Sequence, residues 1–168
     1  MTVPQLFSTE DNSFIQALDK LWHPFAKGIL TLTGVQYSAE VAGIGDAYTA
    51  IETVVLTRPY GYILEQIEFS LTGAVRSSGA VEAVNWKWQA SDDGVLWEDL
   101  IAEQTRAADA SLYADVSCAG RFAPVGNFLG AGPTFQVRFV VRSAAVGGET
   151  AAGETKNSSF IIAKYRKA

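Results

Sequence analysis

Residues 84–100 alternate between large apolar and polar side chains and then turn back on themselves. Before the turn, Val84, Trp86, Trp88 and Ala90 alternate with Asn85, Lys87, Gln89 and Ser91. A period of two is typical of a β-strand that buries one face. The next residues favour a turn, because Asp side chains bond the backbone just ahead and Gly94 tolerates a positive φ. The segment therefore predicts a β-hairpin that carries Trp86, Trp88 and Trp97.

The same alternation recurs along most of the chain after Gly28. It is clean at residues 66–71 and 135–142, where Ile, Leu, Phe and Val alternate with polar side chains. The expected strands span residues 29–33, 50–57, 62–72, 81–91, 95–101, 112–117, 134–143 and 159–166. About eight strands with turns marked by Gly and Pro predict an all-β fold. We expect a two-sheet antiparallel β-sandwich of the jelly-roll kind.

The segment that precedes the strands has a different pattern. Ser8 or Thr9 can cap a short helix, and Pro24 and Gly28 end it. Its apolar residues recur at helical spacing: Phe14, Leu18, Leu21, Trp22 and Phe25. We expect an N-terminal arm and helix over 1–28 and a β-sandwich domain over 29–168. The helix either covers an open end of the sandwich or docks on a neighbouring subunit.

Two segments between the expected strands predict loops. Residues 144–155 repeat Gly-Glu-Thr and hold little apolar mass, so we expect a long exposed loop that folding does not require. Residues 122–133 combine three glycines with Phe122, Phe128 and Leu129. Large apolar side chains in a loop contact either their own core or a partner.

Charge and length exclude several classes of function. The net charge of −5 and the pI of about 4.8 disfavour attraction to DNA or RNA. No apolar run is long enough to cross a membrane. The first residues, Met1 to Gln5, lack the basic and apolar regions of a secretion signal, so we expect synthesis in a cytoplasm without a signal peptide.

Residues that carry chemistry are scarce. Cys118 is the single cysteine and His23 the single histidine, so neither an intrachain disulfide nor a thiolate zinc cluster can form. Nucleotide-binding and common hydrolase motifs do not occur. The densest acidic group could bind Ca²⁺, although Asp is also expected at a turn; it consists of Asp92, Asp93, Glu98 and Asp99. We predict no catalytic residues, no metal and no cofactor.

The hairpin also carries a resemblance. Its turn reads Ser91-Asp92-Asp93-Gly94-Val95-Leu96-Trp97 and resembles the Ser-x-Asp-Gly-x-x-Trp hairpin of discoidin-like and other carbohydrate-binding β-sandwiches. Similar hairpins occur in the jelly-roll and β-sandwich proteins of phage and virus particles, such as tail, fibre and capsid-decorating proteins. The resemblance implies a β-sandwich in which this tryptophan is structural.

These observations favour a non-enzymatic structural subunit of a virus or phage particle, such as a capsid-decoration, minor capsid or tail component. Only 18% of residues are charged, against about 25% in an average domain, which suggests that partners cover part of the surface. We expect a homo-oligomer or contacts with other virion proteins, and a location in virions assembled in a host cytoplasm. The expected contact residues are Phe7, Phe14, Leu18, Trp22, Phe25, Phe128 and Leu129. The alternative is a carbohydrate-binding module or adhesin-like domain, which requires a concave face with exposed aromatic side chains that binds a glycan.

Overall fold

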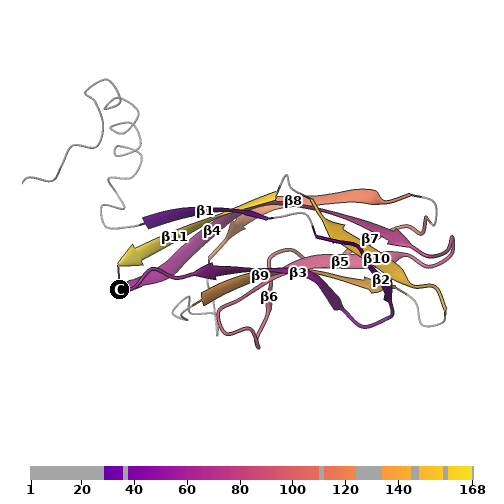
Figure 1. The fold of residues 1–168 in the computed structure, drawn as a ribbon, viewed down its shortest axis with the longest axis horizontal. Helices are drawn as coiled ribbons and strands as arrows, with labels where there is room; N and C mark the ends of the chain where they lie inside the picture. The colour runs from indigo at the N-terminus through magenta and orange to yellow at the C-terminus, as the bar shows by residue number, and fades with distance from the viewer. Residues whose placement is uncertain are drawn as a thin grey trace, which may run out of the picture.

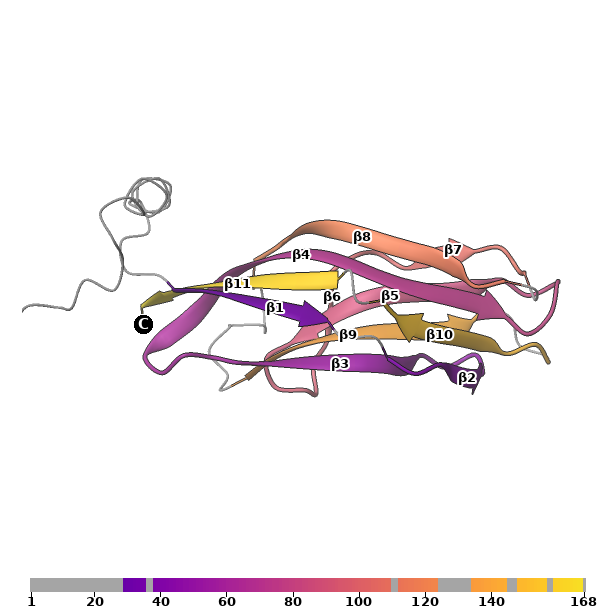
Figure 2. The ribbon, with the colours of Figure 1, turned by 45° about the horizontal axis from the view of Figure 1, so that its top comes forward.

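The computed structural model describes residues 29–35, 38–109, 112–123, 134–144, 148–156 and 159–167. These residues form eleven strands in two antiparallel sheets that pack face to face (Figures 1 and 2). The strands are β1 (Ile29–Val35), β2 (Val41–Ile44), β3 (Thr49–Thr57), β4 (Tyr62–Ser77), β5 (Val84–Ser91), β6 (Glu98–Asp99), β7 (Gln104–Arg106), β8 (Ala114–Phe122), β9 (Thr134–Ser143), β10 (Ala151–Thr155) and β11 (Ser159–Lys167). The described residues contain no helix, and the helix predicted within 1–28 lies outside them.

One sheet is organised around the long strand β4. β8 pairs with β4 over Ile67–Val75, and β11 and β10 pair with it over Tyr62–Ser70 and Gly73–Ser77. Because these ranges overlap, β10 and β11 must share the edge of β4 opposite β8. β2 and β1 then pair with the outer edges of β10 and β11. The second sheet has the order β3-β9-β5, with β6 and β7 both on the free edge of β5.

The pairing is that of a long hairpin folded over on itself. β1 and β2 pair with β11 and β10, β3 pairs with β9, β4 with β8, and β5 with β6 and β7. The first strands thus pair with the last, and each later strand with its counterpart nearer the middle of the chain. Two packed sheets with this wrapping form a jelly roll, which confirms the predicted fold class. The tryptophan hairpin is the tip of the long hairpin.

The predicted number of about eight strands is wrong. Three strands of the ideal pattern are each broken into two short ones: β1 and β2, β6 and β7, and β10 and β11. Side chains hold the breaks together. At one of them the N–H groups of Ser38 and Thr155 each donate to the other residue's hydroxyl, both at 2.9 Å. At another, the N–H of Thr72 donates to Ser159 Oγ at 2.6 Å.

The prediction that 144–155 is one long exposed loop is also wrong. β10 lies within it, and all five of its residues are buried. Small side chains are required there, because a Cβ at Gly153 would lie 3.0 Å from Ile51 Cδ1 and 3.1 Å from Val141 Cγ2. The carboxylate of Glu149 also accepts a hydrogen bond from the N–H of Glu82 at 2.7 Å, which lowers its pKa. The segment therefore completes a sheet.

The inner faces of the two sheets form a single apolar core. Trp86 and Trp88 both point inward and are 7% and 0% exposed, as their spacing predicts. Trp88 stacks on Phe139 at a centroid distance of 4.8 Å, and Trp86 meets the same ring edge-on at 6.2 Å. Other fully buried side chains are Ile67, Leu71, Val75, Val137, Ile161 and Tyr165.

Candidate functional surfaces

The tip of the tryptophan hairpin is held by its own hydrogen bonds. Asp93 Oδ1 accepts the N–H groups of Val95 and Leu96 at 2.7 and 2.8 Å, and these bonds lower the pKa of its carboxyl. The Ser91 hydroxyl accepts the N–H of Gly94 at 2.8 Å, and Gly94 has a φ of 74°. The residues of the Ser-x-Asp-Gly pattern therefore form the turn itself.

The acidic residues of the hairpin do not converge. Asp99 contacts Lys87 Nζ at 2.9 Å and accepts a hydrogen bond from Gln89 Nε2 at 2.7 Å, whereas Asp93 is bound to the turn. In the part of the chain that the structure describes, no three His, Cys, Asp or Glu side chains gather in a group that could hold a metal ion.

Chelation is therefore expected to leave the melting temperature unchanged. A bound ion stabilises the folded state in proportion to its occupancy, so a Ca²⁺ site would make melting depend on calcium. Melting curves with excess chelator and with millimolar Ca²⁺ check this, and Mg²⁺ at equal ionic strength is the control. A reproducible rise of several degrees with Ca²⁺ alone would contradict the prediction.

The tryptophans of the hairpin offer no exposed platform for a sugar ring. Trp86 and Trp88 are in the core, and Trp97 is half-buried. The Arg138 guanidinium lies over the Trp97 ring, 3.8 Å from its centroid, while Trp97 Nε1 donates to the carbonyl of Gly94 at 3.2 Å. Trp97 thus holds the hairpin against β9, in agreement with the structural role that the resemblance implies.

The outer face of the β3-β9-β5 sheet carries a polar network that the sequence patterns do not reveal. Glu103 accepts hydrogen bonds from the Tyr48 hydroxyl, from Asn85 Nδ2 at 3.0 Å and from Arg142 Nη2 at 3.0 Å. Lys87 Nζ lies 4.8 Å from the centroid of the Tyr48 ring. Burial and the bond to Glu103 raise the pKa of Tyr48 to about 12, so this hydroxyl stays protonated. The groups satisfy one another and tie the edge beyond β5 to β9.

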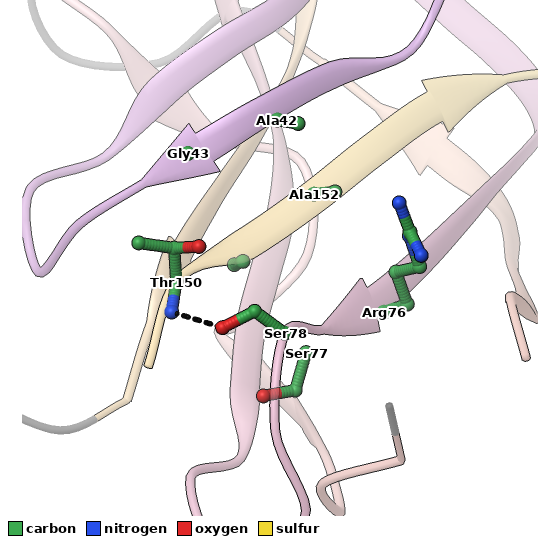
Figure 3. Close-up of a pocket in the computed structure, with 8 residues that line it drawn as sticks. Ala42, Gly43, Arg76, Ser77, Ser78, Thr150 and Ala152 are labelled. Carbon is green, nitrogen blue, oxygen red and sulfur yellow. Dashed lines mark hydrogen bonds between the residues drawn. The ribbon is translucent and has the colours of Figure 1, made fainter. Parts of the chain in front are cut away.

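A shallow pocket of about 170 Å³ lies where β2, β10 and the end of β4 meet (Figure 3). Its lining is Ala42, Gly43, Arg76, Ser77, Ser78, Thr150, Ala151 and Ala152. Arg76 Nη2 is 2.8 Å from Glu40 Oε1, and Ser78 Oγ accepts the N–H of Thr150 at 2.8 Å. The lining supplies hydroxyls and one paired cation, but it contains neither a histidine nor a lysine that could activate a hydroxyl as a nucleophile.

Cys118 has the properties of a structural residue. It lies on β8, half-buried against the core, and burial raises the pKa of its thiol to about 12. A thiol needs a lowered pKa to act as a nucleophile near neutral pH, so its surroundings do not favour catalysis.

An apolar patch lies on the outer face of the other sheet, where β1 and β11 run side by side. Leu30 and Phe160 are 41% and 40% exposed, and Ile162 is half-buried. Ile162 pairs with Glu68, and the side chain of Glu68 forms an exposed ion pair with Arg121. Because residues opposite each other on paired strands share a face, Ile162 also lies on the outer face. Leu30 lies two residues from Leu32, which pairs with Ile162, and Phe160 lies two residues from Ile162 itself. Side chains two residues apart on a strand share a face, so Leu30, Phe160 and Ile162 lie together on the outer face. We call them the outer apolar patch.

The predicted contact residues fall outside the part of the chain that the structure describes: Phe7, Phe14, Leu18, Trp22, Phe25, Phe128 and Leu129. The outer apolar patch was missed because period-two alternation shows which residues share a face but not which face is outward. Among the described residues, no helix is long and apolar enough to cross a membrane.

No protein-family model and no curated protein matches the sequence. The chain is similar in structure to solved proteins of low sequence identity, among them the following three. The first comes from a structure of infectious bursal virus derived T=1 particles; it has a TM-score of 0.47 and 8% identity, and the match covers 84% of this chain and 36% of that one. The second is Eiger TNF from S. frugiperda, with a TM-score of 0.40 and 17% identity; the match covers 84% of this chain and 94% of that one. The third is TmCBM61 in complex with β-1,4-galactotriose, with a TM-score of 0.36 and 10% identity; the match covers 87% of this chain and 94% of that one. The chain thus spans about a third of the length of the first.

Proposed function

We propose that the protein is a non-enzymatic structural subunit of a virus or phage particle and acts through contacts with copies of itself or with other particle proteins. The outer apolar patch carries this proposal. Leu30, Phe160 and Ile162 lie together on two neighbouring strands, and an apolar cluster on a sheet face is stable in water chiefly when another surface covers it.

Two further features support the proposal. The pocket between β2, β10 and the end of β4 is lined by neither histidine nor lysine, and the polar network around Glu103 is internally satisfied. The sequence also carries few charges for its size, which suits a subunit surrounded by neighbours. We accordingly propose a location in virions.

Analytical ultracentrifugation of the full chain, alone and mixed with its native particle, tests the proposal. We expect co-sedimentation with the particle, whether or not the free chain also self-associates. Replacing Leu30 and Phe160 with serine should weaken it, whereas serine at Val55, a residue 55% exposed on the opposite sheet, is the matched control. A strictly monomeric chain that never joins a particle but binds an immobilised glycan would replace the proposal with the carbohydrate-binding alternative.

Removing residues 1–28 is expected to weaken assembly more than it destabilises the sandwich. Phe7, Phe14, Leu18, Trp22 and Phe25 are proposed to contact a neighbouring subunit, whereas β1 begins after the deletion. Sedimentation and thermal melting of the truncated chain separate the two effects. A large fall in melting temperature with unchanged assembly would show that the segment serves the fold of its own chain.

A further inference from the structure

The four outer edges of the two sheets differ in how well they resist pairing with another chain. The edge formed by β1 and β2 is broken between them, β3 has a register shift between Ala50 and Glu52, and β6 and β7 have two and three residues. Breaks, bulges and short strands are the usual protection of a sheet edge. β8 differs, because its nine residues pair with β4 without a register shift and contain neither Lys nor Pro.

The free edge of β8 presents regularly spaced backbone groups. The N–H of Thr72 donates to Ser159, and the N–H of Lys156 donates to the Thr72 carbonyl at 3.1 Å, so the backbone groups of Thr72 face β10 and β11. Ser117, which lies opposite Thr72, therefore directs its N–H and C=O away from β4. The same holds for the residues at spacings of two, which are Asp115, Ala119 and Arg121. In the part of the chain that the structure describes, β8 pairs with β4 alone.

We propose that β8 pairs in an antiparallel manner with β8 of a second copy of this chain, about a twofold axis at Cys118. In this register Asp115 of each copy lies opposite Arg121 of the other, and Ser117 lies opposite Ala119. Both charged residues are exposed on the outer face, so the twofold axis creates two attractive cross-strand pairs. A shift by two residues in either direction loses both pairs.

The two charges remain accessible for this contact. Within one copy, Arg121 Nε is 2.9 Å from Glu68 Oε1, and Asp115 is 4.0 Å from Lys156 Nζ. The side chains of Arg121 and Asp115 are nevertheless 73% and 78% exposed. A guanidinium has five N–H donors and can contact Glu68 and a second carboxylate together. In a contact about a twofold axis, Asp115 of one copy faces Arg121 of the other, and Arg121 of the first faces Asp115 of the second. One complementary pair of residues is therefore enough to specify the register.

Cys118 reports directly on the register. Its backbone groups face β4, so across the twofold axis the two Cys118 residues form a non-hydrogen-bonded pair, with Cα atoms about 4.5 Å apart. That separation permits a disulfide. Mild oxidation of the full chain with copper phenanthroline in air is expected to give a covalent dimer: each thiol loses a proton and an electron, oxygen accepts both electrons through copper, and one S–S bond forms.

The control carries Cys118→Ser with Ser117→Cys. Residue 117 is more exposed than 118, so random collisions would cross-link it faster. In the proposed register, however, the two Ser117 positions are diagonal neighbours about 7–8 Å apart, beyond the reach of a disulfide. We expect a covalent dimer from the native chain and at least tenfold less from the control. Equal or faster cross-linking of the control would overturn the proposed pairing.

Charge reversal tests the same contact without oxidation. Asp115→Arg places four positive charges at the interface and Arg121→Asp four negative charges, so each variant alone should raise the dimer dissociation constant at least tenfold. A mixture of the two variants restores both attractive pairs in a heterodimer, which should dissociate at close to the native concentration. Sedimentation of each variant and of the mixture measures this. A mixture that dimerises no better than its components would contradict the register.

The substitution Ala119→Pro tests whether the dimer can be lost while the fold of each copy is kept. The N–H that this substitution removes faces the free edge, so the pairing of β8 with β4 and the melting temperature should be kept while the dimer is lost. The inference rests on the proposed function only in that copies of the chain must meet. A native chain that joins particles but neither cross-links through Cys118 nor responds to the two charge reversals overturns the β8 contact and leaves the proposed function standing. A β8 dimer that never enters a particle supports the contact and removes the function.

Discussion

Replacing Trp88 with alanine is expected to lower the free energy of unfolding by about 3–5 kcal/mol, because the cavity left by a fully buried aromatic ring closes only in part. The loss includes the stacked contact with Phe139 at 4.8 Å. In a domain of this size the change corresponds to a fall of roughly 10 °C in melting temperature. Denaturant unfolding and thermal melting measure it.

Two substitutions serve as controls for this prediction. Trp97→Ala removes a tryptophan of the same hairpin that is half-buried against Arg138, so its cost should be clearly smaller. Trp88→Phe keeps an aromatic ring against Phe139 and removes a buried indole N–H that has no hydrogen-bond partner, so it should also cost less than alanine. Equal losses for Trp88→Ala and Trp97→Ala would be inconsistent with the described core.

Shortening residues 144–155 to a Gly-Asn turn is expected to prevent folding. The change removes β10, and with it the strand that joins β2 to the end of β4. It also removes Glu149, whose carboxylate accepts N–H groups of Val81 and Glu82. Soluble yield and far-UV circular dichroism measure the effect, which should be a loss of the native β signal.

The matched variant for this prediction is Glu149→Ala. It removes the hydrogen bonds to Val81 and Glu82 but keeps β10, so it should yield folded protein with a lower melting temperature. A shortened chain that melts like the full chain would show that β10 is dispensable after all.

Alternating apolar side chains predict the strands of this fold wherever the side chains on the inner face are large. The strand Thr134–Ser143 has the predicted bounds, and the inward direction of Trp86 and Trp88 follows from their spacing. β10 escaped the prediction because its Ala and Gly residues are buried by the close approach of neighbouring side chains, such as Ile51, and not by their own size. Small residues in a Gly-rich segment are equally typical of an exposed loop.

The surfaces were harder to predict for a related reason. The polar network joins Tyr48 to Glu103 and Glu103 to Arg142, pairs that are 55 and 39 residues apart in the chain. Local patterns contain no information on such contacts, because the jelly-roll wrapping alone brings them together. The regular free edge of β8 is likewise visible only when its pairing with β4 is known, since the sequence predicts a strand at 112–117 but not its neighbours in the sheet.

The position of β10 and β11 has a consequence for how the chain is made on the ribosome. These strands are the last of the eleven to be synthesised, yet they lie between β4 and the two earliest strands, β1 and β2. The hydrogen bonds between Ser38 and Thr155 span 117 residues, so the first strands must wait for nearly the whole domain to emerge. Pairing over such separations slows folding and leaves strand edges exposed in the nascent chain. The sheet is thus complete only after β11 has emerged, and a chain that stops before β11 would lack the strand that joins β1 to β4.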